Sequence, residues 1–133
     1  MKTIPEDFQD LLLDETRAFL FLGTIMKDGH PQVTPVWFNS KNDLILINSA
    51  KGRVKDLNIR RSPLVAMCIQ DPGNPYRYLQ IQGRVIEISE QEANDHINKL
   101  TYKYTGKDKY PYGAPGEIRV CYKIQVQKVD AHG

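Results

Sequence analysis

Segments of alternating apolar and polar residues recur along this chain, with the two-residue period of half-buried β-strands. The pattern predicts six strands, over residues 18–26, 31–39, 44–48, 64–70, 77–88 and 117–129. Turn-forming residues such as Asp28-Gly29 separate neighbouring strands, so hairpins should join them and the sheet should be mostly antiparallel. Closing such a sheet into a barrel would remove its exposed edges.

The last predicted strand has the clearest alternation. One set of its side chains is apolar and should face the core: Ile118, Val120, Tyr122, Ile124 and Val126. The set between them is polar and should face outward: Arg119, Lys123, Gln125 and Gln127. In the fifth strand the apolar residues change face beyond Val85. Together with Gly83, this predicts a β-bulge or a close approach of other backbone.

Three segments have the spacing of helices. The first, residues 5–15, begins with a proline and two acidic residues, which suit the amino end of a helix. The second, residues 54–61, should pack through Val54 and Leu57. The third begins with a capping box at Ser89–Glu92, and its apolar residues follow at spacings of three and four.

The composition is that of one globular domain over residues 1–133, with 41% hydrophobic and 26% charged residues. A net charge of +2 argues against a protein that binds nucleic acid over a wide face. No apolar run reaches the length of a membrane span, and we expect no signal peptide. Cys68 and Cys121 lack CxxC spacing and lie in strand-like runs, so we expect buried thiols and a cytoplasmic location.

Segment 48–61 is the most distinctive part of the sequence. It follows a buried apolar run, and it joins a Ser/Gly turn to the start of a short helix. Only Asp56 opposes its five basic residues, which are Lys51, Arg53, Lys55, Arg60 and Arg61. Free backbone N–H groups at a helix start, with Arg and Lys side chains beside them, form a site for phosphate. The simpler alternative is a solvated basic helix beside a strand.

No set of side chains indicates a catalytic group. The sequence shows no nucleophile with a base and an orienting partner, and no pair of carboxylates set aside for proton transfer. Its three histidines are scattered, without metal-ligand spacing. In an enzyme of this sequence, a cofactor should therefore carry the chemistry while the protein positions it.

Two further stretches have the character of a ligand site. Pro35 interrupts the second strand, which would leave backbone groups free to meet a ligand ring. The alternative is an ordinary edge-strand proline, with Trp37 packed in the core. Tyr76-Arg77-Tyr78 could stack on a flat heterocycle, or it could lie on the surface at the start of a strand.

These stretches together resemble the pyridoxamine 5'-phosphate oxidase-related split-barrel proteins, most closely the branch that uses the deazaflavin coenzyme F-420. The resemblance rests on residues 32–37 and 48–57, and residues 71–79, 83–85 and 104–111 continue it in order. It implies a mainly β fold, a six-stranded antiparallel split β-barrel with flanking helices. It also implies a homodimer with two cofactor sites at its interface.

The resemblance implies the following site. The cofactor phosphate would be held by Lys51, Arg53 and Lys55, with Ser49 and Asn58 as nearby polar contacts. The ring would lie along the backbone of Val33, Thr34, Pro35 and Val36. Tyr78 and Gln80 would approach from the partner subunit. The cofactor would be FMN or F-420, and the reaction a hydride transfer between that cofactor and a small conjugated acceptor.

Two other functions fit the sequence. One is a non-enzymatic carrier of FMN, haem or a nucleotide on the same fold. The other is a small barrel that binds nucleic acid through its basic helix, which the small net charge argues against. We therefore expect neither a nucleic-acid partner nor a membrane partner.

Overall fold

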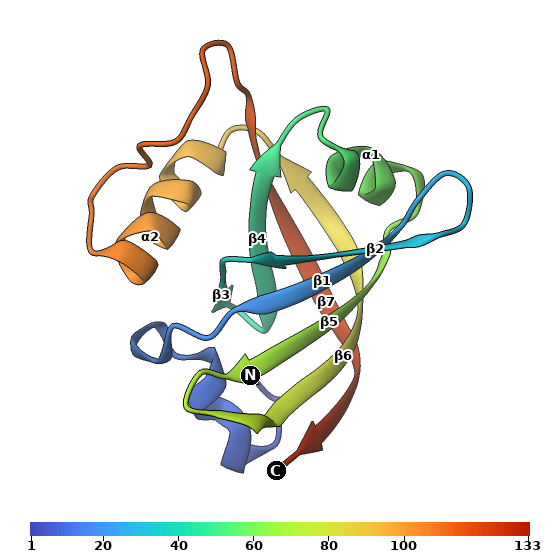
Figure 1. The fold of residues 1–133 in the computed structure, drawn as a ribbon, viewed down its shortest axis with the longest axis vertical. Coiled ribbons are helices and arrows are strands. Elements are labelled where there is room, and N and C mark those ends of the chain that lie inside the picture. Colours follow the sequence, from blue (N-terminus) through green and yellow to red (C-terminus); the bar gives the residue numbers. More distant parts are fainter.

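The fold of residues 1–133, seen in a computed structural model, is a strongly curled antiparallel sheet with two α-helices at its sides (Figure 1). Its seven strands are β1 Leu20–Ile25, β2 Pro31–Val36, β3 Phe38–Lys41, β4 Leu44–Ala50, β5 Leu64–Asp71, β6 Asn74–Ser89 and β7 Arg119–His132. The α-helices are α1 Val54–Arg61 and α2 Ala93–Thr105, and two 3-10 helices, η1 Glu6–Leu12 and η2 Asp14–Thr16, precede the sheet. The strand order is β2-β1-β5-β6-β7-β4-β3. The predicted antiparallel split barrel is confirmed.

The structure has seven strands where the pattern predicted six, because one predicted strand is divided in two at Trp37. The predicted strand 31–39 becomes β2, which pairs with β1, and β3, which pairs with β4. Because β2 and β3 lie at the two edges of the sheet, one continuous stretch of chain spans both edges. The barrel is therefore closed by the covalent chain at Trp37, without a ladder of hydrogen bonds across the split.

The interior of the barrel holds one cluster of 21 buried apolar residues. In β7 the inward set is as predicted from Val120 to Val126, whereas Ile118 lies before the strand and is exposed. The prediction that Arg119 faces solvent is wrong, because only 8% of it is accessible. α2 packs against β7 and β4, so it covers part of the outer sheet face that the alternation assigned to water.

The irregularity predicted at Gly83 is confirmed. The β6–β7 register shifts between Gln82 and Gly83, and a Cβ at Gly83 would lie 2.7 Å from Ile124 Cγ2 and 2.8 Å from Met67 Cε. A second shift follows Val85 and leaves Ile86 exposed on the outer side. β6 can therefore bend closely over the core only where it has no side chain.

The helices differ in part from the predictions. The segment 5–15 forms two 3-10 helices, because Leu13 is extended and interrupts the turn. The Ser89 hydroxyl accepts a hydrogen bond from the Glu92 N–H (3.3 Å), as a capping box requires, but α2 itself starts one turn later.

The predicted packing of α1 is wrong. Val54 and Leu57 are exposed, and the buried residues of this helix are Asp56, Asn58 and Ile59. The helix is therefore held to the barrel largely by polar contacts, which an apolar pattern does not reveal.

No helix is long and apolar enough to cross a bilayer. Both cysteines are free thiols, and Cys121 is buried whereas Cys68 is half-buried. Burial raises the pKa of the Cys121 thiol to about 11, so it is uncharged at neutral pH.

Candidate cofactor site

We call residues 51–55, between β4 and α1, the basic turn. Gly52 has a φ of +90°, a conformation that glycine adopts without steric cost. The Lys51 N–H donates to the carbonyl of Ile118 (2.8 Å), and this bond ties the turn to the chain entering β7. The glycine that the sequence places here is thus needed to turn the backbone sharply at the end of β4.

The amino end of α1 has open hydrogen-bond donors. The backbone N–H groups of Val54, Lys55 and Asp56 make no hydrogen bond, and no side chain caps the helix. Free N–H groups at a helix start carry partial positive charge and point along the axis away from the helix. An anion placed there would accept hydrogen bonds from several of them at once.

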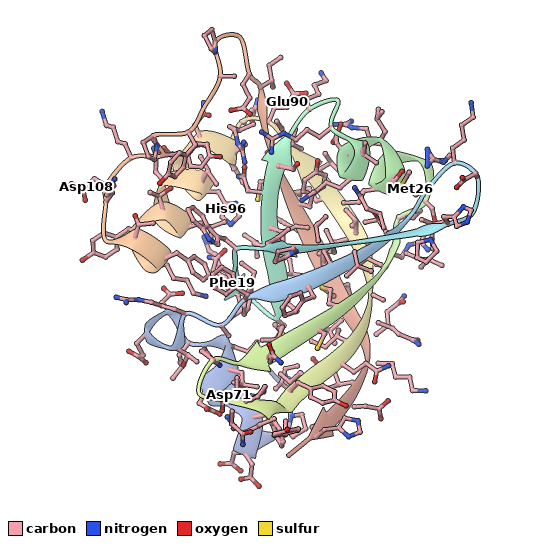
Figure 2. All side chains as sticks on the ribbon, in the orientation of Figure 1. Phe19, Met26, Asp71, Glu90, His96 and Asp108 are labelled. Carbon is pink, nitrogen blue, oxygen red and sulfur yellow. The ribbon has the colours of Figure 1, made fainter.

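The cations of the basic turn differ in their partners. Lys51 pairs with Glu90 (3.0 Å), whose position beside the end of β4 is seen in Figure 2, and Arg53 pairs with Glu117 (3.0 Å). Lys55 is half-buried and makes neither a hydrogen bond nor an ion pair. Burial, and then the charges of Arg53 and Arg119, lower the pKa of Lys55. A bound anion would relieve this repulsion among three cations.

Asp56 holds the basic turn in place through hydrogen bonds. Its buried carboxylate accepts hydrogen bonds from the Gly52 N–H (2.9 Å), from the Tyr122 hydroxyl and from Arg60 Nε (3.0 Å). Burial would raise the pKa of this carboxyl, but these three donors outweigh it and hold the pKa below its ordinary value. The sequence showed Asp56 only as the single acid among bases, since one of its partners, Tyr122, lies 66 residues away.

Two polar residues predicted beside the phosphate have different surroundings. Ser49 is the penultimate residue of β4, and its buried hydroxyl has no hydrogen-bond partner. Asn58 faces β1 and β2: its amide donates to Thr24 Oγ1 (3.0 Å) and Gln32 Oε1 (3.3 Å), and its oxygen accepts from Arg61 (2.8 Å). The side chain of Asn58 therefore fixes α1 on the sheet, whereas the hydroxyl of Ser49 remains free.

The segment predicted to line the ring lies on edge strand β2. Val33 and Pro35 are exposed, Thr34 is half-buried and Val36 is buried. A proline at this edge is consistent with both predicted readings, an edge strand and backbone groups open to a ligand.

Trp37 does not pack in the core as expected. Its ring is half-buried and stacks on Tyr104 with centroids 5.2 Å apart. With Pro35 and Val36 it lines a cavity of about 260 Å³, which is also bounded by Phe19, Asn48, Ile97, Leu100, Tyr110, Tyr112 and Arg119. The corner that closes the barrel is therefore also one wall of a mostly apolar cavity.

Arg119 connects the basic turn with this cavity, and sequence reasoning missed it. Its charge acts on Lys55, its Nε donates to Asn48 Oδ1 (2.9 Å), and its guanidinium lies 4.9 Å from the centre of the Tyr110 ring. The alternation along β7 assigned Arg119 to solvent, and the position of α2 over that face could not be read from the pattern. Arg119 is the first residue of β7, and this position gave no other sign of its role.

A family profile described as pyridoxamine 5'-phosphate oxidase matches residues 4–133 of this chain. The chain belongs to that family. A solved structure named F420 reductase is 31% identical, with a TM-score of 0.82 over 96% of this chain and 98% of that chain. The curated proteins contain no match.

More distant structures share the fold of this pyridoxamine 5'-phosphate oxidase family member. A conserved hypothetical protein of Mycobacterium tuberculosis is 21% identical, with a TM-score of 0.71 over 97% of this chain and 84% of that one. The HupZ protein of Group A Streptococcus is 15% identical, with a TM-score of 0.68 over 96% of this chain and 93% of that one. The fold thus persists where little sequence is shared.

The single chain of this family member does not bring Tyr78 and Gln80 to the basic turn. Tyr78 pairs with His132 across β6 and β7 and stacks on its ring (4.8 Å). His132 is the penultimate residue, and the C-terminus lies at the opposite end of the molecule from α1 in Figure 1. Gln80 is exposed on the same strand. These two residues would reach a cofactor only from a second subunit.

The stretch around Tyr78 also contains a structural residue. Arg77 pairs with Asp10 (2.6 Å) and Asp71 (3.0 Å), and its guanidinium lies 4.8 Å from the Phe8 ring centre. Arg77 therefore ties η1 to the sheet.

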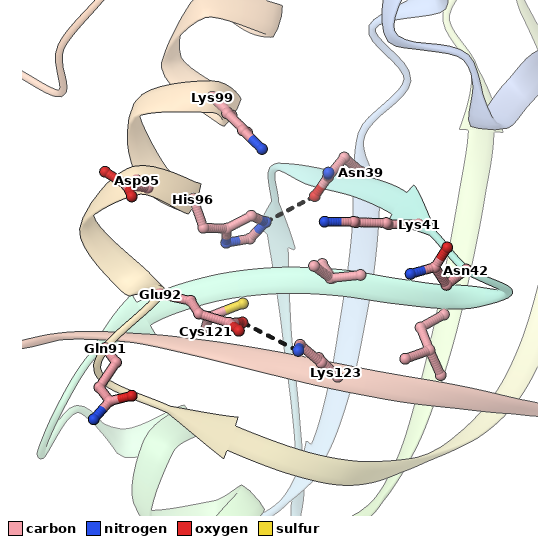
Figure 3. A pocket seen from close by; sticks show the side chains of 12 residues that line it. Asn39, Lys41, Asn42, Gln91, Glu92, Asp95, His96, Lys99, Cys121 and Lys123 are labelled. Carbon is pink, nitrogen blue, oxygen red and sulfur yellow. Dashed lines mark hydrogen bonds and ion pairs between the residues drawn. The ribbon is translucent and has the colours of Figure 1, made fainter.

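A larger cavity, of about 340 Å³, lies between part of α2 and the outer face of β3, β4 and β7 (Figure 3). His96 lies in its wall, where it donates from Nε2 to Asn39 Oδ1 (2.7 Å) and accepts at Nδ1 from Asn48 (3.1 Å). Burial, and then Lys99, lower the pKa of His96 to about 4, so the ring is neutral at physiological pH. The lysines around this cavity are offset by Glu92 and Asp95, and none of its side chains belongs to the basic turn.

Proposed function

We propose that this protein is an oxidoreductase that binds FMN or coenzyme F-420 and passes a hydride between that cofactor and a small conjugated acceptor. Membership of the family and 31% identity to a protein named F420 reductase support a redox function of this type. The basic turn supplies the physical reason for a phosphorylated cofactor.

The observation that carries the proposal is the convergence of open donors at the basic turn. The start of α1 combines three backbone N–H groups without partners, the unpaired ammonium of Lys55 and the guanidinium of Arg53, which pairs with Glu117. They fit a phosphate dianion, which accepts several charge-assisted hydrogen bonds. The hydroxyl of Ser49, near the end of β4, is buried and has no hydrogen-bond partner.

The chain's own residues would hold and orient the cofactor. The basic turn would bind the phosphate, and the exposed edge from Val33 to Val36 would lie along the ring. When bound, the cofactor supplies the hydride chemistry, so no side chain is assigned as an acid or base. Asp56 would keep the turn in shape, because it already holds the Gly52 N–H and Tyr122 together.

We propose further that the active form is a homodimer. The sheet register places a continuous set of side chains on one outer face of β2, β1 and β5: Pro31, Val33, Pro35, Phe21, Ile25, Leu64, Ala66 and Cys68. Val33 is 65% accessible and Leu64 52%, which is unusual for apolar residues that share one face of a monomer. A second copy on this face would cover the patch and could bring its Tyr78 and Gln80 to the cofactor.

The test is a binding titration with FMN and with F-420, followed by absorbance. The double variant Arg53→Ala plus Lys55→Ala should bind the cofactor about tenfold more weakly or worse, since it loses two charge-assisted bonds. Lys2→Gln removes an exposed charge elsewhere and should change nothing. An unchanged dissociation constant in a folded double variant would refute the assignment of the phosphate site.

A further inference from the structure

The cavity beside Trp37 is lined by a largely buried cation, Arg119. Arg119 is only 8% accessible, and its Nη1 makes no hydrogen bond. The nearest acceptor, Glu117 Oε1, lies 3.3 Å away without hydrogen-bond geometry, and the same oxygen already accepts from Arg53 (3.0 Å). Glu117 therefore offsets the charge of Arg119 only in part, because it shares this oxygen with Arg53. Since Arg119 borders the cavity, an oxygen of a ligand placed there would add a favourable charge-assisted contact.

A chain of hydrogen bonds fixes the direction of this guanidinium. Arg119 Nε donates to Asn48 Oδ1 (2.9 Å), Asn48 Nδ2 donates to His96 Nδ1 (3.1 Å), and His96 Nε2 donates to Asn39 (2.7 Å). An amide oxygen only accepts, so the proton of neutral His96 lies on Nε2 and every link has a defined direction. Figure 3 shows the last link, from His96 on α2 to Asn39 on β3. Arg119 is thus positioned before any ligand arrives.

The walls of the cavity suit a flat ring. Trp37 is stacked on Tyr104, and Tyr110 meets Trp37 edge-on, with ring centroids 6.4 Å apart and planes at 88°. Tyr112 stands edge-on to Tyr110 in turn (5.6 Å, 78°). Rings in this arrangement present faces and edges to an aromatic ligand. The volume of about 260 Å³ limits the ligand to a small one.

We propose that this cavity binds the acceptor and that the acceptor is a planar conjugated carboxylate. Its ring lies against Trp37 and Tyr110, and its carboxylate accepts a hydrogen bond from the guanidinium of Arg119, which lines the cavity. The site adjoins Pro35 and Val36, so the acceptor lies next to the edge assigned to the cofactor ring. The role as acceptor rests on the proposed function, whereas the binding preference does not.

Trp37 is the only tryptophan, so its fluorescence reports on the cavity directly. The probes are cinnamate and its neutral analogue cinnamamide, titrated into the cofactor-free protein. Cinnamate should bind about tenfold more tightly or better than cinnamamide, because only the carboxylate makes a charge-assisted bond with Arg119. Equal affinity for the two probes, or no quenching by either, overturns the proposal.

Variants separate the carboxylate contact from the shape of the cavity. Arg119→Gln should remove the preference for cinnamate and leave the affinity for cinnamamide unchanged. Arg119→Lys keeps the buried charge, so it should retain part of the preference for cinnamate. A preference that survives Arg119→Gln overturns the proposal. If Arg119→Gln does not fold, Arg119→Lys and the wild-type comparison decide the question.

The two proposals fail in different ways. Lys55→Gln should weaken binding of FMN or F-420 and leave cinnamate binding unchanged. If the protein prefers cinnamate over cinnamamide but binds neither FMN nor F-420, the proposed function is refuted and the carboxylate site stands. If the protein binds a cofactor but does not prefer cinnamate over cinnamamide, only the carboxylate site is refuted. The same conclusion follows if the bound cofactor displaces cinnamate.

Discussion

At the scale of single residues, the charged groups that matter most are buried and held by polar partners. Asp56 joins Gly52, Arg60 and Tyr122, and Arg119 joins Asn48 and Glu117. Breaking a buried charged contact leaves the remaining partner unsatisfied, at a cost of several kcal/mol. These residues therefore stabilise the same regions of the fold that we assign to ligand binding.

His96 makes the stability of the protein depend on pH. Its folded-state pKa of about 4 lies below the ordinary value of 6.5, so the unfolded chain binds the proton more readily. The contribution to stability is complete above the ordinary pKa and is lost as pH falls toward 4. The free energy of unfolding should fall by about 2 kcal/mol between pH 7 and pH 5 from this residue alone.

Urea unfolding of wild type and His96→Gln at the two pH values checks this. Glutamine does not titrate, so the variant should lack this component of the pH dependence even if it is less stable throughout. Equal slopes with pH in the two proteins would show that His96 is not the responsible group.

At the scale of elements, the bend of β6 over the core depends on a missing side chain. In Gly83→Ala the new methyl group would meet Ile124 Cγ2, Met67 Cε and the carbonyl of Gln125, the last at 3.0 Å. Overpacking of this kind costs about 1–3 kcal/mol. The midpoint of urea unfolding should therefore fall.

Gly23→Ala is the matched control for that change. Gly23 also lies within a strand, but a Cβ there would meet nothing closer than 3.4 Å, the carbonyl oxygen of Ala66. Its effect on the unfolding midpoint should be small, and a loss as large as that of Gly83→Ala would contradict the steric explanation.

At the scale of the whole molecule, the uncovered face of β1, β2 and β5 predicts self-association. Leu64→Glu places a charge at 52% accessibility within that face, where it would be buried without a partner in a dimer. By sedimentation, the wild type should have twice the chain mass of 15.3 kDa and the variant the chain mass itself. The variant should also lose cofactor binding, since Tyr78 and Gln80 of a second subunit would be absent.

Tyr102→Glu serves as the control, because this exposed residue lies on α2, away from the apolar face. It should remain dimeric. A wild-type protein that sediments as a monomer would exclude the homodimer.

The sequence by itself determined the class of fold and the place of the basic turn. Strand periodicity depends on which side chains meet the core, and the irregularity at Gly83 shows in the same pattern. The basic turn is local as well, because its glycine, its cations and its helix start are consecutive residues. Each of these features depends on neighbours within a few positions along the chain.

Only the tertiary structure decided which polar residues are buried. Asp56 meets Tyr122 across 66 residues, and Arg119 meets Asn48 across 71. Arg119 alternates with the core residues of β7 as a solvent-facing residue would, and it is buried because other parts of the chain lie over it. Coverage of an outer sheet face depends on how separate elements pack, and a periodic pattern along one strand contains no information about that.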